Sequence, residues 1–193
     1  MDQAFYLFFD TETTGIPKNY KAPVSDLKNW PRLVQIAWLV TDDKGSEIHS
    51  AEHIVKPDGF TIPADAAKIH GITTNIALER GVAIRAVLDA MVKDIETAQI
   101  LLAHNMAFDE KILGAELLRA GYPNHIEAKQ RQCTMQSATD FCRLPGPYGF
   151  KWPTLNELHL KLFGASFSGA HRALIDVRAC AKCFFELKRL KIM

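Results

Sequence analysis

Runs of apolar residues near the N-terminus predict three β-strands. Phe5 to Phe9 are almost wholly apolar, which is typical of a central strand buried on both faces. Arg32–Thr41 and Ile48–Val55 are two further strand-like segments, and the tight turn 42–45 separates them. The segment 15–31 is rich in Pro, Lys and Asn and is predicted to be a loop. We therefore expect an antiparallel meander of three strands.

After Pro63 the apolar spacing becomes helical. Helices are predicted over Ala64–His70, Thr73–Arg80, Ile84–Thr97, Ala107–Ala120, Gln136–Cys142, Thr154–Phe163 and His171–Leu190. Short strands are expected at Ile100–Ala103 and Gln132–Met135, and a loop at Leu144–Pro153. Three antiparallel strands followed by alternating helices and strands predict an α/β fold, with a mixed five-stranded sheet flanked by helices. This order is compatible with a ribonuclease H-like architecture in a single domain over residues 1–193.

Composition and charge narrow the class of protein. Hydrophobic residues make up 48% of the 193 residues and charged residues 23%, as in folded globular domains. There is no signal-peptide pattern and no long apolar run, so we expect no membrane association and a cytoplasmic location. The net charge of +1 gives no global attraction to polyanions, so any nucleic-acid binding must depend on a local patch.

The four cysteines offer little metal chemistry. Only Cys180 and Cys183 have a ligand-like spacing, and no second matching pair accompanies them. They lie in the apolar part of a predicted helix, which favours buried free thiols over a zinc site.

The chemistry-bearing candidates are acids scattered along the chain. Asp10 and Glu12 follow the first apolar run two residues apart, so their side chains project from one face of a strand. Gly15 then allows a sharp turn that leaves backbone N–H groups near them for a phosphate or a hydroxyl. Carboxylates brought together repel one another unless a hard divalent cation neutralises them. This pattern indicates a metal-dependent hydrolase.

Two later segments carry further candidates. Asp109 falls in the first turn of a predicted helix, where it is equally well explained as an acid that favours the helix dipole. His171 and Asp176 are separated by about 140° of helical rotation, so they cannot point the same way if both are helical. We expect His171 at or before the helix N-terminus and Asp176 facing inward.

Together the segments Asp10–Gly15, His104–Asp109 and His171–Asp176 resemble the histidine-bearing branch of the DEDD superfamily of 3′→5′ exonucleases. That branch includes the proofreading epsilon subunits of bacterial DNA polymerase III. The segments 69–73 and 151–155 add support, and the resemblance runs from Phe5 to about Lys182.

The resemblance implies a site for two divalent cations, Mg²⁺ or Mn²⁺. Asp10, Glu12 and Asp176 would hold the first cation, Asp10 would bridge to the second, and Asp109 would support the second through water. His171 would take the proton from the attacking water.

The resemblance also implies contacts to a terminal nucleotide. The residues are Thr13, Thr14, Ile69, His70, His104, Asn105 and Phe108. Ile69 and Phe108 have a competing interpretation as core residues, and His104 and Asn105 would either flank the scissile phosphate or buttress the site. The loop 144–153 mixes aromatic residues with a lysine, as surfaces that bind single strands do, but it is also explained as a packed crossover.

The expected substrate is a nucleic acid with a free 3′ end, with single-stranded or mispaired DNA favoured over RNA. The alternatives are an exoribonuclease of the oligoribonuclease or ribonuclease T type, and a non-catalytic nucleic-acid-binding module on the same fold. Association with a polymerase is implied by the resemblance, but the sequence ends about ten residues after Cys183, so we expect no C-terminal tether of the kind that many relatives have.

Overall fold

The computed structural model describes residues 5–168 and 172–193. Its elements are β1 (Tyr6–Thr13), β2 (Leu33–Thr41), β3 (Glu47–Ile54), α1 (Ala64–His70), α2 (Thr74–Arg80), α3 (Ile84–Thr97), β4 (Ile100–Ala103), α4 (Met106–Arg119), β5 (Gln130–Cys133), α5 (Thr134–Ser137), α6 (Thr139–Cys142), β6 (Pro145–Gly146), β7 (Gly149–Phe150), α7 (Leu155–Phe163) and α8 (Ala173–Arg189). Within the described ranges, no helix combines the length and the apolar composition needed to cross a membrane.

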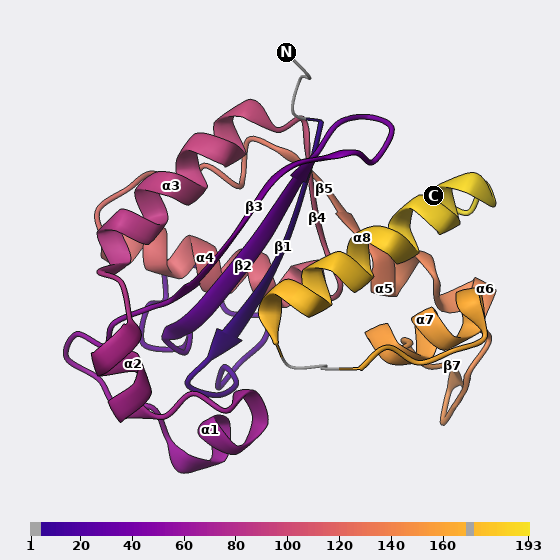
Figure 1. The fold of residues 1–193 in the computed structure, drawn as a ribbon. Coiled ribbons are helices and arrows are strands. Elements are labelled where there is room, and N and C mark those ends of the chain that lie inside the picture. The colour runs from indigo at the N-terminus through magenta and orange to yellow at the C-terminus, as the bar shows by residue number, and fades with distance from the viewer. Residues whose placement is uncertain (1–4, 169–171) are drawn as a thin grey trace.

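A five-stranded mixed sheet forms the centre of the molecule, in the order β3-β2-β1-β4-β5. Strands β1, β2 and β3 are antiparallel neighbours, whereas β4 lies parallel to β1 and β5 parallel to β4. Figure 1 shows this sheet with helices on both sides. The predicted fold class is therefore confirmed.

The alternation of side chains along β1 gives the sheet two different apolar faces. Leu7 and Phe9 belong to a core cluster with residues of α3 and α4. Tyr6 and Phe8 belong to a second cluster, with residues of α8. Helix α8 crosses this second face of the sheet (Figure 1). In its apolar part, β1 therefore packs one face against α3 and α4 and the other face against α8.

Several predicted boundaries differ from the structure. Strand β1 continues beyond the apolar run as far as Thr13, because its polar end still pairs with β2. Strand β5 ends at Cys133, not Met135, because the buried Thr134 begins α5. The single helix predicted over Gln136–Cys142 is two short helices, α5 and α6. The loop 144–153 contains the small hairpin β6–β7.

A buried ion-pair network joins the loop before β2 to α4. Glu116 is 2% exposed and accepts hydrogen bonds from Arg32 Nε at 2.8 Å, Arg119 Nη1 at 2.8 Å and the Leu33 backbone N–H at 3.1 Å. Arg119 also donates to the carbonyl oxygens of Leu27 and Trp30. The network therefore fixes the start of β2 and the end of the preceding loop against α4.

Replacing Glu116 with Ala should destabilise the protein by about 3 kcal/mol, because two guanidinium groups lose their buried partner. This value is at the low end for a buried pair, since Arg32 remains 28% exposed. Urea unfolding measures the change. Glu186→Ala is the matched control, because it removes an exposed pair with Arg189 and should have little effect. Equal losses in the two variants would show that the Glu116 network does not hold the fold.

Candidate active site and metal centre

Two acidic side chains of β1 lie on the face of the sheet that α8 covers. Tyr6 and Phe8 already pack against α8, and side chains alternate along a strand. The same parity places Asp10 and Glu12 beyond them on that face. The register supports this, since Asp10 pairs with Ala37 of β2, and Ala37 belongs to the same apolar cluster.

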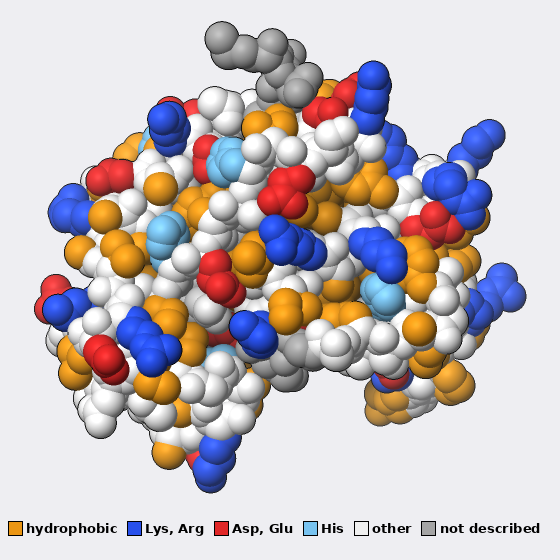
Figure 2. Space-filling view, in the orientation of Figure 1, with side chains coloured by type: hydrophobic (Ala, Val, Ile, Leu, Met, Phe, Trp, Pro, Cys, Tyr) orange, Lys and Arg blue, Asp and Glu red, His pale blue; other side chains and the backbone are white. Residues whose placement is uncertain are grey.

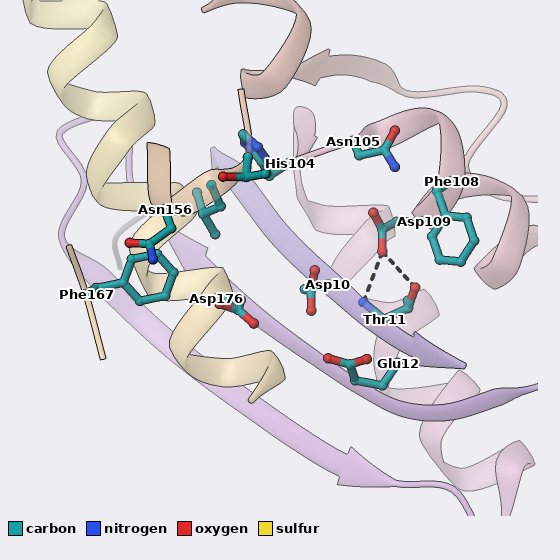
Figure 3. A pocket seen from close by; sticks show the side chains of 12 residues that line it. Asp10, Thr11, Glu12, His104, Asn105, Phe108, Asp109, Asn156, Phe167 and Asp176 are labelled. Carbon is teal, nitrogen blue, oxygen red and sulfur yellow. Dashed lines mark hydrogen bonds between the residues drawn. The ribbon is translucent and has the colours of Figure 1, made fainter. Parts of the chain in front are cut away.

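The third acid comes from the first turn of α8. Asp176 lies three residues after Ala173 and four before Cys180, and both of these neighbours are buried against the sheet. Helical spacing therefore turns Asp176 inward with them. One carboxylate oxygen from each of Asp10, Glu12 and Asp176 lies within 4.8 Å of the others. In the described part of the chain, this is the group of ligand atoms arranged to hold a metal ion, and Figure 3 shows the three side chains converging.

Asp109 approaches from the opposite layer. It is 3% exposed, lies in the first turn of α4, and its Oδ1 accepts hydrogen bonds from the Thr11 backbone N–H at 3.0 Å and the Thr11 hydroxyl at 2.7 Å. Pairing between β1 and β4 ends at Phe8, so the later residues of β1 lie beyond that neighbouring strand. The Asp109 carboxylate is hydrogen-bonded to Thr11 in this end of β1, as Figure 3 shows.

Burial and mutual repulsion raise the pKa values of these acids. The pKa of Asp10 is raised well above its usual value, first by burial and then by the charges of Asp109, Glu12 and Asp176. Burial and the charges of Asp176 and Asp109 raise the pKa of Glu12 to about 8. Burial raises the pKa of Asp109 to about 7, although the Thr11 hydrogen bonds oppose that shift. A divalent cation would remove the repulsion and favour the ionised forms, so the donor set fits a hard metal ion.

His104 supports the site from behind. Its Nδ1 lies 2.9 Å from Thr134 Oγ1 and its Nε2 lies 3.0 Å from Pro153 O. Burial lowers the pKa of His104 to about 4, so the ring is neutral near pH 7. Because both ring nitrogens have protein partners, this arrangement fits the buttressing alternative. The next residue, Asn105, adopts a left-handed φ of 84° and starts α4.

Two adjoining pockets meet at Glu12. The first has a volume of about 530 Å³. Its lining residues are Asp10, Thr11, Glu12, His104, Asn105, Phe108, Asp109, Thr154, Leu155, Asn156, Phe167 and Asp176. The second has a volume of about 430 Å³ and shares Thr11, Glu12 and Phe108 with the first. Both volumes fall in the range of small-ligand sites, so the four acids line one space of nucleotide size and Glu12 also borders a second.

The predicted substrate residues largely line the second pocket. Thr13, Thr14, Ile69 and His70 are all on its wall. Ile69 is 61% exposed, so its competing interpretation as a core residue is wrong. Phe108 combines both interpretations, because it packs against the core and also lines both pockets.

The hydroxyl groups of the two threonines hold the turn after β1. Thr13 Oγ1 donates to Gly15 O at 2.6 Å, and Thr14 Oγ1 accepts from the Arg32 backbone N–H at 3.0 Å. These bonds shape the wall of the second pocket from within the protein.

Other lining residues were not singled out from the sequence. Asn156 lies between Thr154 and Glu157, which form the capping box of α7. Phe167 follows α7, and its ring centroid is 5.4 Å from that of His159. The capping pattern locates the start of α7 but does not show which side chains of its first turn face the acids. His171, the predicted base, lies outside the described residues.

Comparisons with known proteins agree on one family. The family model described as "Exonuclease", RNase T, matches residues 7–184. The DNA polymerase III epsilon subunit of Treponema pallidum is 31% identical over 177 residues, which cover 91% of this chain and 73% of that protein. The epsilon subunit of Buchnera aphidicola is 26% identical over 117 residues, covering 61% of this chain and 46% of that protein.

Solved structures share the fold. A zinc-bound complex of Escherichia coli exonuclease I with single-stranded DNA superposes with a TM-score of 0.78 at 22% identity, covering 98% of this chain and 42% of that one. Exonuclease I from Methylocaldum szegediense gives a TM-score of 0.73 at 22% identity, covering 95% and 40%. The chain thus spans less than half the length of these two exonuclease I chains.

The raised pKa values predict that the metal-free protein loses stability as pH rises. The unfolded acids ionise near pH 4, whereas the folded Glu12 ionises near 8. Between these values the folded state binds more protons, so its stability falls with increasing pH until the folded acids have ionised. Thermal unfolding in EDTA should therefore give a melting temperature that declines from about pH 5 to about pH 8.

Asp10→Asn should flatten this decline and raise the metal-free melting temperature near pH 8 by at least ~2 °C, because a neutral amide removes one repelling charge. Mn²⁺ should stabilise the wild-type protein more than this variant. Asp140→Asn, at an exposed position on α6, is the control and should behave as wild type. A wild-type melting temperature that rises steadily over this pH range would contradict the repulsion.

Proposed function

The chain belongs to the RNase T exonuclease family, and on that basis we propose that it is a metal-dependent 3′→5′ exonuclease. It would hydrolyse single-stranded or mispaired 3′ ends of DNA and release nucleoside 5′-monophosphates.

The observation that carries this proposal is the convergence of Asp10, Glu12 and Asp176. Their oxygens lie within 4.8 Å of one another in the wall of the first pocket, and Glu12 also borders the second. Oxygen donors of this kind suit Mg²⁺ or Mn²⁺. These three residues would hold the first cation, and Asp10 would bridge to the second. Asp109, which Thr11 holds through one oxygen, would support the second cation through water.

The proposed reaction is an in-line displacement at phosphorus. The cations held by these carboxylates would supply positive charge to stabilise both the attacking and the leaving oxygen. His171 would accept the proton from the attacking water, because an imidazole pKa lies near neutral pH. The bond between phosphorus and the 3′ oxygen breaks, and that oxygen takes a proton to give the new 3′ hydroxyl of the shortened strand.

The second pocket would hold the terminal nucleotide. Ile69 and Phe108 offer apolar surface to a base or sugar, and His70 lies on the same wall. The backbone around Glu12 and Thr13, with the Thr14 side chain, would meet the terminal nucleotide. Asn105 would flank the scissile phosphate, with His104 acting as the buttress behind it.

Three similar proteins support DNA as the substrate. The epsilon subunits are components of a DNA polymerase, and the exonuclease I structure contains single-stranded DNA. Association of this chain with a polymerase follows from the same likeness and is proposed with it.

The purified protein should shorten a single-stranded DNA oligonucleotide labelled at its 5′ end when Mg²⁺ is present, and EDTA should stop the reaction. Asp10→Asn and Asp176→Asn should each lower the rate by about 10³-fold or more, since each removes a ligand of the proposed cation. Asp140→Asn, which removes an exposed acid on α6, is the matched control and should leave the rate unchanged.

A substrate panel of single-stranded, duplex and mismatched DNA with a matched RNA tests the preference. Faster shortening of RNA would replace the DNA proposal with an exoribonuclease. Binding of oligonucleotides without any shortening would instead indicate the non-catalytic module.

His171→Ala should bind Mn²⁺ as wild type does in calorimetry, because the carboxylates are the ligands, but should lose about 10²-fold or more of its turnover. Normal turnover by this variant at neutral pH would show that another group takes the proton.

A further inference from the structure

Three aromatic side chains are unusually exposed on one small projection. Tyr148 is 102% exposed, Phe150 50% and Trp152 61%, and all three lie within or beside the hairpin β6–β7. Figure 2 shows a clump of hydrophobic side chains projecting at the lower right, where Figure 1 places this hairpin. Single exposed apolar residues are ordinary, but a cluster of large aromatics on a projection indicates a binding surface.

The hairpin has a defined shape. Gly146 pairs with Gly149 across a turn made by Pro147 and Tyr148, which puts Tyr148 at the tip. A Cβ at Gly146 would lie 3.0 Å from the backbone N of Lys151 and 3.1 Å from Gly149 O, so a larger residue there would have to push its neighbours apart slightly. The aromatic rings therefore extend from a closely packed turn.

The base of the hairpin is tied to α7. Lys151 Nζ lies 2.6 Å from Glu157 Oε1, and Glu157 belongs to the capping box of α7. Phe150 ends β7, and Trp152 follows it two residues later, shortly before the start of α7.

The hairpin leads directly into the wall of the first pocket. Pro153 follows Trp152, and its carbonyl oxygen accepts a hydrogen bond from His104 Nε2 at 3.0 Å. The following residues Thr154 and Asn156 line the pocket. The chain from Tyr148 to Thr154 spans at most roughly 20 Å at ~3.3 Å per residue. At ~3.4 Å per nucleotide, a stacked strand leaving the pocket would need at most about six nucleotides to reach the tip.

The exposed rings, and not the local charge, indicate the ligand. The sequence from Phe141 to Asn156 contains Arg143 and Lys151, but Asp140 and Glu157 flank it and Glu157 pairs with Lys151. Exposed aromatic rings bind single-stranded nucleic acid without sequence preference, because every base can stack.

We infer that the hairpin β6–β7 is a stacking surface for the single-stranded nucleic acid upstream of the 3′ end held at the acids. The inference rests on the proposed nuclease function and adds a second binding region to it. Long strands would engage the pocket and the hairpin together, whereas a dinucleotide would engage the pocket alone.

Steady-state kinetics on two substrates tests this. On single-stranded DNA of about 15 nucleotides, Tyr148→Ala and Trp152→Ala should each raise KM about tenfold with kcat unchanged. On a dinucleotide, both variants should match the wild type. Tyr148→Phe should keep the low KM, because the ring is retained. Leu160→Ala, which removes a 49% exposed apolar side chain from α7, is the matched control and should change neither substrate.

The outcomes separate this inference from the proposed function. A wild-type protein that hydrolyses neither substrate with Mg²⁺ or Mn²⁺ would overturn the nuclease proposal and the hairpin inference with it. If the wild type is active but KM for the long strand is unchanged in both alanine variants, the hairpin inference alone is overturned. The rings would then be assigned to a protein partner. An equal rise in KM on the dinucleotide would also overturn the hairpin inference. Thermal unfolding should show that the alanine variants fold as the wild type does.

Discussion

The repulsion among Asp10, Glu12 and Asp176 is the constraint on which the site depends. The fold brings one oxygen of each within 4.8 Å of the others, and burial then raises the pKa of Asp10 well above its usual value. Such an arrangement is unfavourable for the protein alone and becomes favourable when a cation shares the carboxylates. The fold therefore imposes repulsion among the carboxylates, and a bound cation would remove it. The stability of the protein and its activity should respond to the same ion.

Strand β1 carries this arrangement because its two faces serve different layers. The side chains of even-numbered residues, including Asp10 and Glu12, face α8, whereas Thr11 faces α4. There Asp109 Oδ1 accepts hydrogen bonds from the Thr11 hydroxyl at 2.7 Å and the Thr11 backbone N–H at 3.0 Å. Because β1 is the middle strand of the sheet, acids from both helix layers converge at its end. The buried Glu116 network then fixes α4 and the start of β2 around this point. The position of the acids is thus a consequence of sheet topology.

Periodicity was enough to predict the strands of the N-terminal meander, the helix 84–97 and the common face of Asp10 and Glu12, because these features depend on neighbours in the sequence. The hydrogen bonds between Asp109 and Thr11 join residues 98 positions apart, so no local sequence pattern predicts them. The aromatic hairpin shows the same limit. Its composition fitted both a packed crossover and an open surface, and only the tertiary structure shows its rings to be exposed.

Counting the protons released when Mn²⁺ binds tests the central claim most directly. Calorimetry in buffers of different ionisation enthalpy gives this number at each pH. If the acids repel one another as described, binding near pH 7 should release about one proton or more, and the release should decline at pH values well above the Glu12 pKa of about 8. Binding near pH 7 without proton release would show that the carboxylates are already ionised, and would contradict the account.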